Sequence, residues 1–216
     1  MKVIFLDIDG VLNSTTSTII RHHLGTNDNM HYVSEENFNL LKILVDEANA
    51  HIVISSTWRK DRGFIEQAQN EKDIIEKFRV FFKEHGWENA PIIGITPNLS
   101  GFRGEEVATY LDGLSKTDII EDYIIIDDDS DFILSDLKEM NPIRLDRMKI
   151  YSEEDLYKKS LYWSNQKFYQ IDRNTGLTLK NVYEILNNFD KNNNLVKDLK
   201  DVLSWKKFWQ MKKLII

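Results

Sequence analysis

Two clusters of acidic residues could hold a metal ion and a charged ligand. Asp7 and Asp9 directly follow an apolar run, and the single residue between them lets both carboxylates leave a strand end in the same direction. Gly10 comes next and permits a tight turn and close backbone approach to a ligand. Residues 127–131 hold four acids in five positions, which repel one another unless a cation lies among them. Because Mg²⁺ prefers oxygen ligands, this loop predicts a magnesium site; an acidic turn and a solvated acidic loop are the alternatives.

Hydroxyl groups that could hold a phosphate follow a second apolar run. Ser56 and Thr57 come after residues 51–55, and hydroxyls and free amides at a strand end can bind phosphate oxygens. An ordinary helix N-cap is the alternative for this segment. Arg103 begins a helical pattern one element before the acidic loop, and we expect it to balance the acids. A surface arginine is the alternative, although its charge is mildly unfavourable in the first turn of a helix.

Apolar runs that alternate with helical patterns must position these groups. The runs are typical of buried strands and cover residues 2–6, 51–55, 91–95, 123–126 and 168–171. A helix with Ser34 as its N-cap follows the first run, and two further helical patterns lie around residues 74–82 and 103–114. This alternation predicts a Rossmann-like three-layer α/β/α sandwich with a mostly parallel sheet. Such sheets bind ligands at the carboxyl ends of their strands, where the acids and hydroxyls lie.

Length and composition narrow the class of protein. The 216 residues, 42% of them hydrophobic, can form one substantial core, and we expect a single domain over residues 1–189. A net charge of −7 argues against a general nucleic-acid coat protein, which needs clustered basic residues. The absence of cysteine excludes disulfides, zinc thiolate sites and cysteine nucleophiles. No apolar run approaches the roughly 20 residues of a membrane span, so we expect a cytoplasmic protein.

The ordered motifs resemble those of the haloacid dehalogenase (HAD) superfamily of phosphotransferases. The segment FLDIDGVLN is similar to the first motif of that superfamily, and Ser56 in VISSTWR stands where the second motif has Ser or Thr. Arg103 takes the place of the basic residue of the third motif, and IIIDDDSD resembles the acidic fourth motif. The resemblance covers about residues 1–140, with a weak continuation in the GLT of residues 176–178. The first and fourth motifs are specific, whereas the second and third are permissive.

The resemblance implies a phosphatase mechanism. Asp7 would attack phosphorus and form an aspartyl-phosphate, and Asp9 would protonate the leaving oxygen and then activate water. Ser56 and Arg103 would grip the non-bridging oxygens. The second acid, two residues after the nucleophile, fits a phosphatase better than a dehalogenase.

The resemblance also implies the Mg²⁺ ligands. They would be Asp7, the backbone carbonyl of Asp9 and an acid of the fourth motif. Asp127 and Asp128 are the predicted acids of that motif, and the pair Asp128 with Asp131, as well as Asp129, stays open as an alternative.

The substrate must be inferred from the parts around the motifs. Residues 13–33 are too short for a cap domain but could form a flap, which is either a polar surface loop or a contact to the leaving group. A minimal cap suits large substrates, and VISSTWR resembles HAD domains associated with RNA repair and polynucleotide kinase-phosphatases. This implies removal of a terminal phosphate, often a 3′ one, from nucleic acid or a nucleotide. Small metabolites, or a catalytically silent ligand-binding module, are the alternatives.

Four residues are candidates for substrate contacts beside the motifs. Gly10 would allow close backbone approach, and Thr57 would add a hydroxyl group. Trp58 and Arg59 could stack on and contact a nucleotide, with packing of Trp58 against the sheet as the alternative. The flap carries Arg21, three histidines and no acid in a convincing metal pattern, so a second metal site is disfavoured there.

Two segments lie outside the resemblance. Residues 190–216 are predicted to form a basic amphipathic C-terminal helix, with seven lysines against two aspartates within 191–216. This helix could dock on the core or form a homodimer, and a nucleic-acid clamp or a membrane-surface helix are alternatives. Residues 144–166 could form a helical insertion near the substrate face.

Overall fold

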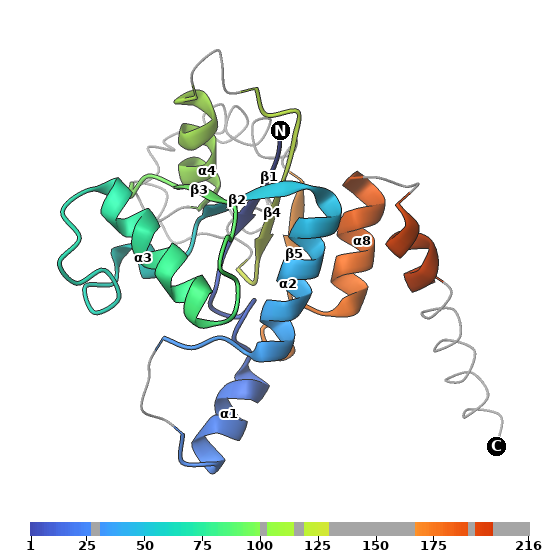
Figure 1. Cartoon of the computed structure of the whole chain (residues 1–216), viewed down its shortest axis with the longest axis horizontal. Coiled ribbons are helices and arrows are strands. Elements are labelled where there is room, and N and C mark those ends of the chain that lie inside the picture. The colour runs from blue at the N-terminus through green and yellow to red at the C-terminus, as the bar shows by residue number, and fades with distance from the viewer. Residues whose placement is uncertain (27–30, 100–102, 115–118, 130–166, 190–192, 201–216) are drawn as a thin grey trace, which may run out of the picture.

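Five parallel strands form one sheet in the order β3-β2-β1-β4-β5. The structure is a computed structural model that describes residues 1–26, 31–99, 103–114, 119–129, 167–189 and 193–200 (Figure 1). The strands are β1 (Lys2–Leu6), β2 (Ala50–Ile54), β3 (Ile92–Ile95), β4 (Asp122–Asp127) and β5 (Phe168–Gln170). The helices are α1 (Thr15–His23), α2 (Glu35–Ala48), η1 (Thr57–Lys60), α3 (Glu71–Glu84), α4 (Arg103–Asp112) and α8 (Leu179–Phe189).

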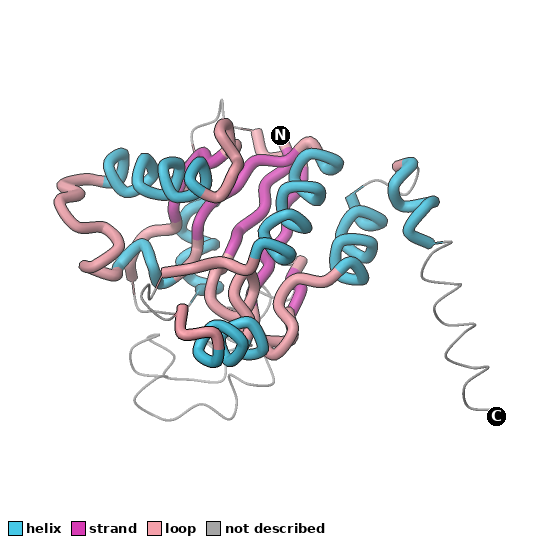
Figure 2. Tube along the Cα trace, turned by 60° about the horizontal axis from the view of Figure 1, so that its bottom comes forward, coloured by secondary structure: helices cyan, strands magenta, loops and turns pink. Residues whose placement is uncertain are grey.

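Alternating side chains of β1 are buried on both faces of the sheet. Ile4 and Leu6 join the larger core, which contains apolar residues of α2, α3 and α8. Val3 and Phe5 join the smaller core with Val107 of α4 on the opposite face. Figure 2 shows helices lying along the sheet, and the central strand is covered on both sides. The three-layer α/β/α architecture predicted from the sequence is therefore confirmed.

The helices begin and end where local chemistry predicts. Ser34 caps α2 by accepting a hydrogen bond from the amide of Asn37, and the apolar stripe of this helix is buried. Asn49 ends α2 in the left-handed conformation, with φ of 49°, which asparagine tolerates better than most residues. The expected helix from Arg103 extends to Asp112 rather than to Leu114. The strand positions are confirmed within one residue at either end.

The flap contains a helix that the sequence pattern did not predict. Ser14 caps α1, and no residue of α1 is buried. The Tyr32 hydroxyl lies 3.2 Å from Ser17 Oγ, and the guanidinium of Arg21 lies over the Tyr32 ring. The amide of Ser34 donates to Leu12 O at 2.7 Å, which closes the base of the flap. The flap is thus tied together near its base while α1 projects from the body (Figure 1).

Of the two segments outside the resemblance, residues 144–166 and 190–216, the structure describes only residues 193–200. Residues 194–200 are helical, and Val196 and Leu199 are buried in the larger core. The rest of the predicted tail helix and the insertion at 144–166 lie outside the described residues, and the homodimer has no support in the structure. Among the described helices, none combines the length and hydropathy needed to cross a membrane.

A buried asparagine fixes the turn after β5 against the rest of the domain. Asn37 is 5% exposed, and its Nδ2 donates to Thr175 O at 3.2 Å and to Leu177 O at 2.7 Å. The Leu177 amide donates to Val11 O at 2.8 Å, so the same turn also contacts the loop after β1. Gly176 has a φ of 70°, and a Cβ there would lie 2.7 Å from Val11 O, so only glycine fits.

We expect Asn37→Ala to lower the free energy of unfolding by about 1–3 kcal/mol, because the buried carbonyl of Leu177 and the part-buried carbonyl of Thr175 lose their donor. Urea denaturation followed by circular dichroism measures this loss. Asn39→Ala, an exposed position on the same helix, is the matched control and should change stability by less than about 0.5 kcal/mol. Equal effects of the two substitutions would contradict the assigned role of Asn37.

Candidate active site

The register of the sheet brings two acids of separate motifs side by side. Leu6 of β1 pairs with Ile126 of β4, so the residues that follow, Asp7 and Asp127, leave adjacent strands at the same level. The Asp7 amide donates to Ile126 O at 3.0 Å and extends the ladder by one bond. These acids therefore meet at the carboxyl edge of the sheet without any loop having to fold over.

Three carboxylates form one cluster at this edge. One oxygen each of Asp7, Asp127 and Asp128 lies within 4.8 Å of the others. Asp7 and Asp127 are fully buried, and burial raises the pKa of each, with the charge of Asp7 adding to the rise at Asp127. Burial and the charge of Asp7 also raise the pKa of Asp128. Because three ionised carboxylates this close repel one another, a cation placed among them would be strongly favoured.

Arg103 balances part of this charge from the start of α4. Its Nη1 lies 2.5 Å from Asp7 Oδ2 and 2.5 Å from Asp127 Oδ2. Burial alone would lower the pKa of Arg103, but the two carboxylates outweigh burial and raise it. Arg103 stands at the acids, as the sequence predicted, and binds them directly.

Asp128 fits into the cluster because Gly10 has no side chain. Gly10 has a φ of 74°, and a Cβ on it would lie 2.3 Å from Asp128 Cγ. Arg173, in the turn after β5, lies with its Nε 3.2 Å from Asp128 Oδ2. The sequence patterns did not indicate Arg173, because it lies far beyond the four motifs. Asp129 is exposed, its amide donates to Asp127 Oδ1, and Asp131 lies outside the described residues.

Asp9 is not part of the acidic cluster and has its own partners. Trp58 Nε1 donates to Asp9 Oδ2 at 2.9 Å, and Asn13 Nδ2 donates to Asp9 Oδ1 at 2.9 Å. Asn13 Oδ1 in turn accepts from the Gly10 amide at 2.8 Å. The two acids of the first motif therefore lie in different environments, one buried among carboxylates and one half-buried between two N–H donors.

The turn after β2 divides its residues between the site and the interior. Ser56 is fully buried and caps η1. Its hydroxyl also lies close to Asp7, where it opposes the rise in the pKa of that acid, although the two groups do not form a well-aligned hydrogen bond. Thr57 is exposed, and Trp58 is only 4% exposed. The prediction that Trp58 stacks on a nucleotide does not fit this burial. The alternative, a Trp58 ring packed in the interior, fits the structure, and the indole N–H donates to Asp9.

The position of Arg59 does not fit the nucleotide contact expected for this residue. The guanidinium is buried, donates to the backbone oxygens of Ser55, Ser56 and Thr96, and pairs with buried Glu106 of α4. Burial lowers the pKa of Arg59 in spite of this partner. A nucleotide that bound the guanidinium would compete with these bonds, although the Arg59 side chain also lines the groove described below. Arg59 instead joins the ends of β2 and β3 to α4, and Glu106 lies one turn after Arg103, so this pair helps to place Arg103.

Comparison with known proteins agrees with this geometry. A family model described as the HAD domain in Swiss Army Knife RNA repair proteins matches residues 3–182. The chain belongs to this family. Neither the curated proteins nor the solved structures give a significant match. The match extends the resemblance seen in the sequence motifs from about residue 140 through β5 and the start of α8.

The carboxylates of this HAD domain fit a magnesium ion. Asp7 Oδ2 contacts Arg103, whereas Oδ1 accepts no well-aligned hydrogen bond from the described residues, so the lone pairs of Oδ1 are available to a cation. The cluster supplies three hard oxygen ligands from Asp7, Asp127 and Asp128 without histidine or sulfur, which suits Mg²⁺ better than Zn²⁺. No histidine of the flap joins a cluster of this kind within the described residues.

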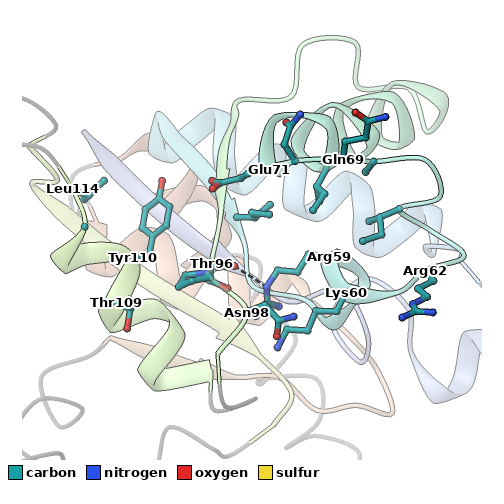
Figure 3. A pocket seen from close by; sticks show the side chains of 17 residues that line it. Arg59, Lys60, Arg62, Gln69, Glu71, Thr96, Asn98, Thr109, Tyr110 and Leu114 are labelled. Atoms are coloured by element: carbon teal, nitrogen blue, oxygen red, sulfur yellow. Dashed lines mark hydrogen bonds between the residues drawn. The ribbon is translucent and has the colours of Figure 1, made fainter.

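A groove of about 670 Å³ lies beside β3, the edge strand of this HAD domain, between the loop before α3, the end of β3 and the second half of α4. Figure 3 shows Lys60 and Arg62 on one side of it and Tyr110 and Leu114 on the other. Thr96 lines the groove and lies level with Asp7 in the sheet register, two strands away. At the usual strand spacing this is about 10 Å. No acid of the cluster lines the groove, so a substrate held at Asp7 would have to extend about this far to enter it.

We expect Gly10→Ala to remove Mg²⁺ binding, because the new Cβ would push the Asp128 carboxylate out of the cluster. The measurement is the rise in melting temperature on adding Mg²⁺, which should vanish in this variant. Gly25→Ala is a matched control, since Gly25 has a φ of 67° but no atom within 4 Å of an added Cβ. It carries the same backbone strain and should keep the Mg²⁺ response. A full response in Gly10→Ala would contradict the assigned cluster.

Proposed function

We propose that this HAD domain is a Mg²⁺-dependent phosphatase that removes a terminal phosphate, in particular a 3′ phosphate, from nucleic acid or a nucleotide. One observation carries the proposal: Asp7 lies in a buried cluster with Asp127 and Asp128, while Asp9 lies outside it with separate donors. Two carboxylates in such different environments suit two different roles. The family's association with RNA repair supports a nucleic-acid substrate.

In the first step an oxygen of Asp7 forms a bond to phosphorus as the bond from phosphorus to the leaving oxygen breaks. A proton on the Asp9 carboxyl group moves to that leaving oxygen, which departs as an alcohol. In the second step Asp9 takes a proton from water as the water oxygen bonds to phosphorus. The bond between phosphorus and Asp7 then breaks, inorganic phosphate leaves, and both acids return to their starting states.

The remaining residues of the cluster serve charge and position. Bound Mg²⁺ would neutralise phosphoryl charge and reduce the repulsion between Asp7 and the phosphate. Asp127, Asp128 and the backbone carbonyl of Asp9 are the proposed further ligands. With that charge balanced, Arg103 would turn from the carboxylates to the non-bridging oxygens, and Ser56 would donate its hydroxyl to them.

The groove supports a substrate larger than a free phosphate ester. It combines the basic side chains of Lys60 and Arg62 with apolar walls from Ile65 and Leu114. Lys60 pairs with Glu106 at 2.7 Å, so Arg62, which is exposed, is the better candidate for a backbone phosphate. Apolar walls can accept a base while a cation holds the backbone, as single-strand binding surfaces do.

Asp7→Asn should abolish Mg²⁺-dependent hydrolysis of p-nitrophenyl phosphate by the full chain, because an amide cannot act as the nucleophile. Asp129→Asn is the matched control from the same acidic run as Asp127 and should keep at least half of the wild-type rate. Loss of activity in Asp129→Asn would instead favour Asp129, the alternative left open by the sequence, as a metal ligand. A well-folded wild-type chain that hydrolyses no phosphoester in the presence of Mg²⁺ would contradict the phosphatase proposal.

A substrate panel identifies the leaving group. We expect higher kcat/KM on a 3′-phosphorylated oligoribonucleotide than on a 5′-phosphorylated one, a mononucleotide or a sugar phosphate. Arg62→Ala should lower kcat/KM on the oligonucleotide about 3- to 10-fold and reduce the slope of its logarithm against log salt by about 0.7, the effect of one phosphate contact on a single strand. Lys180→Ala on α8 removes the same charge elsewhere and should change neither. Equal rates on free nucleotides would count against a polynucleotide substrate.

A further inference from the structure

The carboxylate of Asp9 receives one N–H donor on each oxygen, from two different parts of the chain. Trp58 of η1 donates to Oδ2, and Asn13 at the base of the flap donates to Oδ1, both at 2.9 Å. We propose that Trp58 and Asn13 are positioning residues that aim Asp9 at the leaving oxygen. This inference rests on the proposed function, because it assigns Asp9 the proton transfers described above.

The two donors fix the carboxylate without using up its capacity. A carboxylate offers about four lone-pair sites, so one donor on each oxygen leaves further sites for the travelling proton. Two bonds on opposite oxygens also prevent the group from rotating about its Cβ–Cγ bond. Asp9 can therefore meet the leaving oxygen in the first step and water in the second from one fixed orientation, as general acid–base catalysis requires.

The indole of Trp58 is a rigid donor because aromatic rings surround it. The ring centroids of His31, Phe64 and Phe81 lie 4.8, 5.3 and 5.4 Å from that of Trp58. Rotation of the indole away from Asp9 would break these contacts. Ser56, which belongs to the proposed phosphate grip, lies two residues earlier and caps the same turn. Packing of one aromatic side chain thus sets the direction of the acid relative to that grip.

Asn13 links the same carboxylate to the flap. Its Oδ1 accepts from the Gly10 amide, which fixes the amide orientation and turns Nδ2 toward Asp9. Nδ2 also lies 3.4 Å from Tyr32 O, so the two ends of the flap meet at this side chain. One amide group therefore contributes both to the orientation of Asp9 and to the contact between the two ends of the flap.

The test compares kcat/KM on two leaving groups, because kcat/KM reports the steps up to departure of the alcohol and is unaffected by later hydrolysis. p-Nitrophenolate is a stable anion that needs little protonation, whereas the ribose hydroxyl of a nucleoside 3′-phosphate needs a full proton. We expect Trp58→Phe and Asn13→Ala to lower kcat/KM about 10- to 100-fold on the nucleoside phosphate and less than about 3-fold on p-nitrophenyl phosphate. Trp87→Phe makes the same change at another buried tryptophan and should show no such selectivity.

A second measurement is independent of turnover. The ¹H–¹⁵N signal of the Trp58 indole, assigned by its loss in Trp58→Phe, should shift in Asp9→Ala, while the signal of Trp87, assigned in the same way from Trp87→Phe, stays in place. An unshifted signal, or an equal loss of kcat/KM on both substrates, would overturn the positioning role. Failure of the wild type to hydrolyse either ester would instead overturn the phosphatase proposal, and the catalytic role of the two donors with it. The indole signal would then still show whether the contact to Asp9 exists.

Discussion

Three carboxylates held together in a buried position are the constraint on which the rest of this structure depends. Two like charges 4 Å apart repel by about 4 kcal/mol at an effective dielectric constant of 20. One oxygen each of Asp7, Asp127 and Asp128 lies within 4.8 Å of the others, close to that separation, and burial raises the pKa of all three. A chain that folds in this way needs a compensating cation, and Arg103 supplies one such charge.

Separate elements of the fold hold this cluster in place. The parallel register of β1 and β4 places Asp7 beside Asp127, and the bare backbone of Gly10 leaves room for Asp128. Arg103 reaches the acids from α4, whose first turns are anchored by the buried pair of Arg59 and Glu106. The strand register, the glycine and the buried pair are constraints on the backbone and on packing, whereas the contact of Arg103 with the acids is the part that the proposed mechanism changes.

The sequence predicts the parts of this arrangement that are local. Buried strands are continuous apolar runs, and parallel strands place the residues after them at one edge, so Asp7, Asp127 and Asp128 could be grouped without coordinates. The direction of a side chain in a short turn is not local. Trp58 and Arg59 are adjacent in η1, and only the packing of the Phe64 and Phe81 rings and the position of Glu106 decide that neither ring nor guanidinium faces solvent. Asn13 and Arg173 were missed because polar residues in loops carry no periodic signal.

The turn after β2 shows why one short segment matters to both stability and chemistry. Ser56 faces the cluster, Trp58 donates to Asp9, and Arg59 joins two strands to α4, so successive residues serve the phosphate grip, the acid and the scaffold. A shift of this turn would move all three groups together. The covalent chain therefore fixes the spacing of their backbone positions, while the packing around each side chain sets its direction. The flap, tied to the same acid through Asn13, adds an element that could respond to the size of the leaving group.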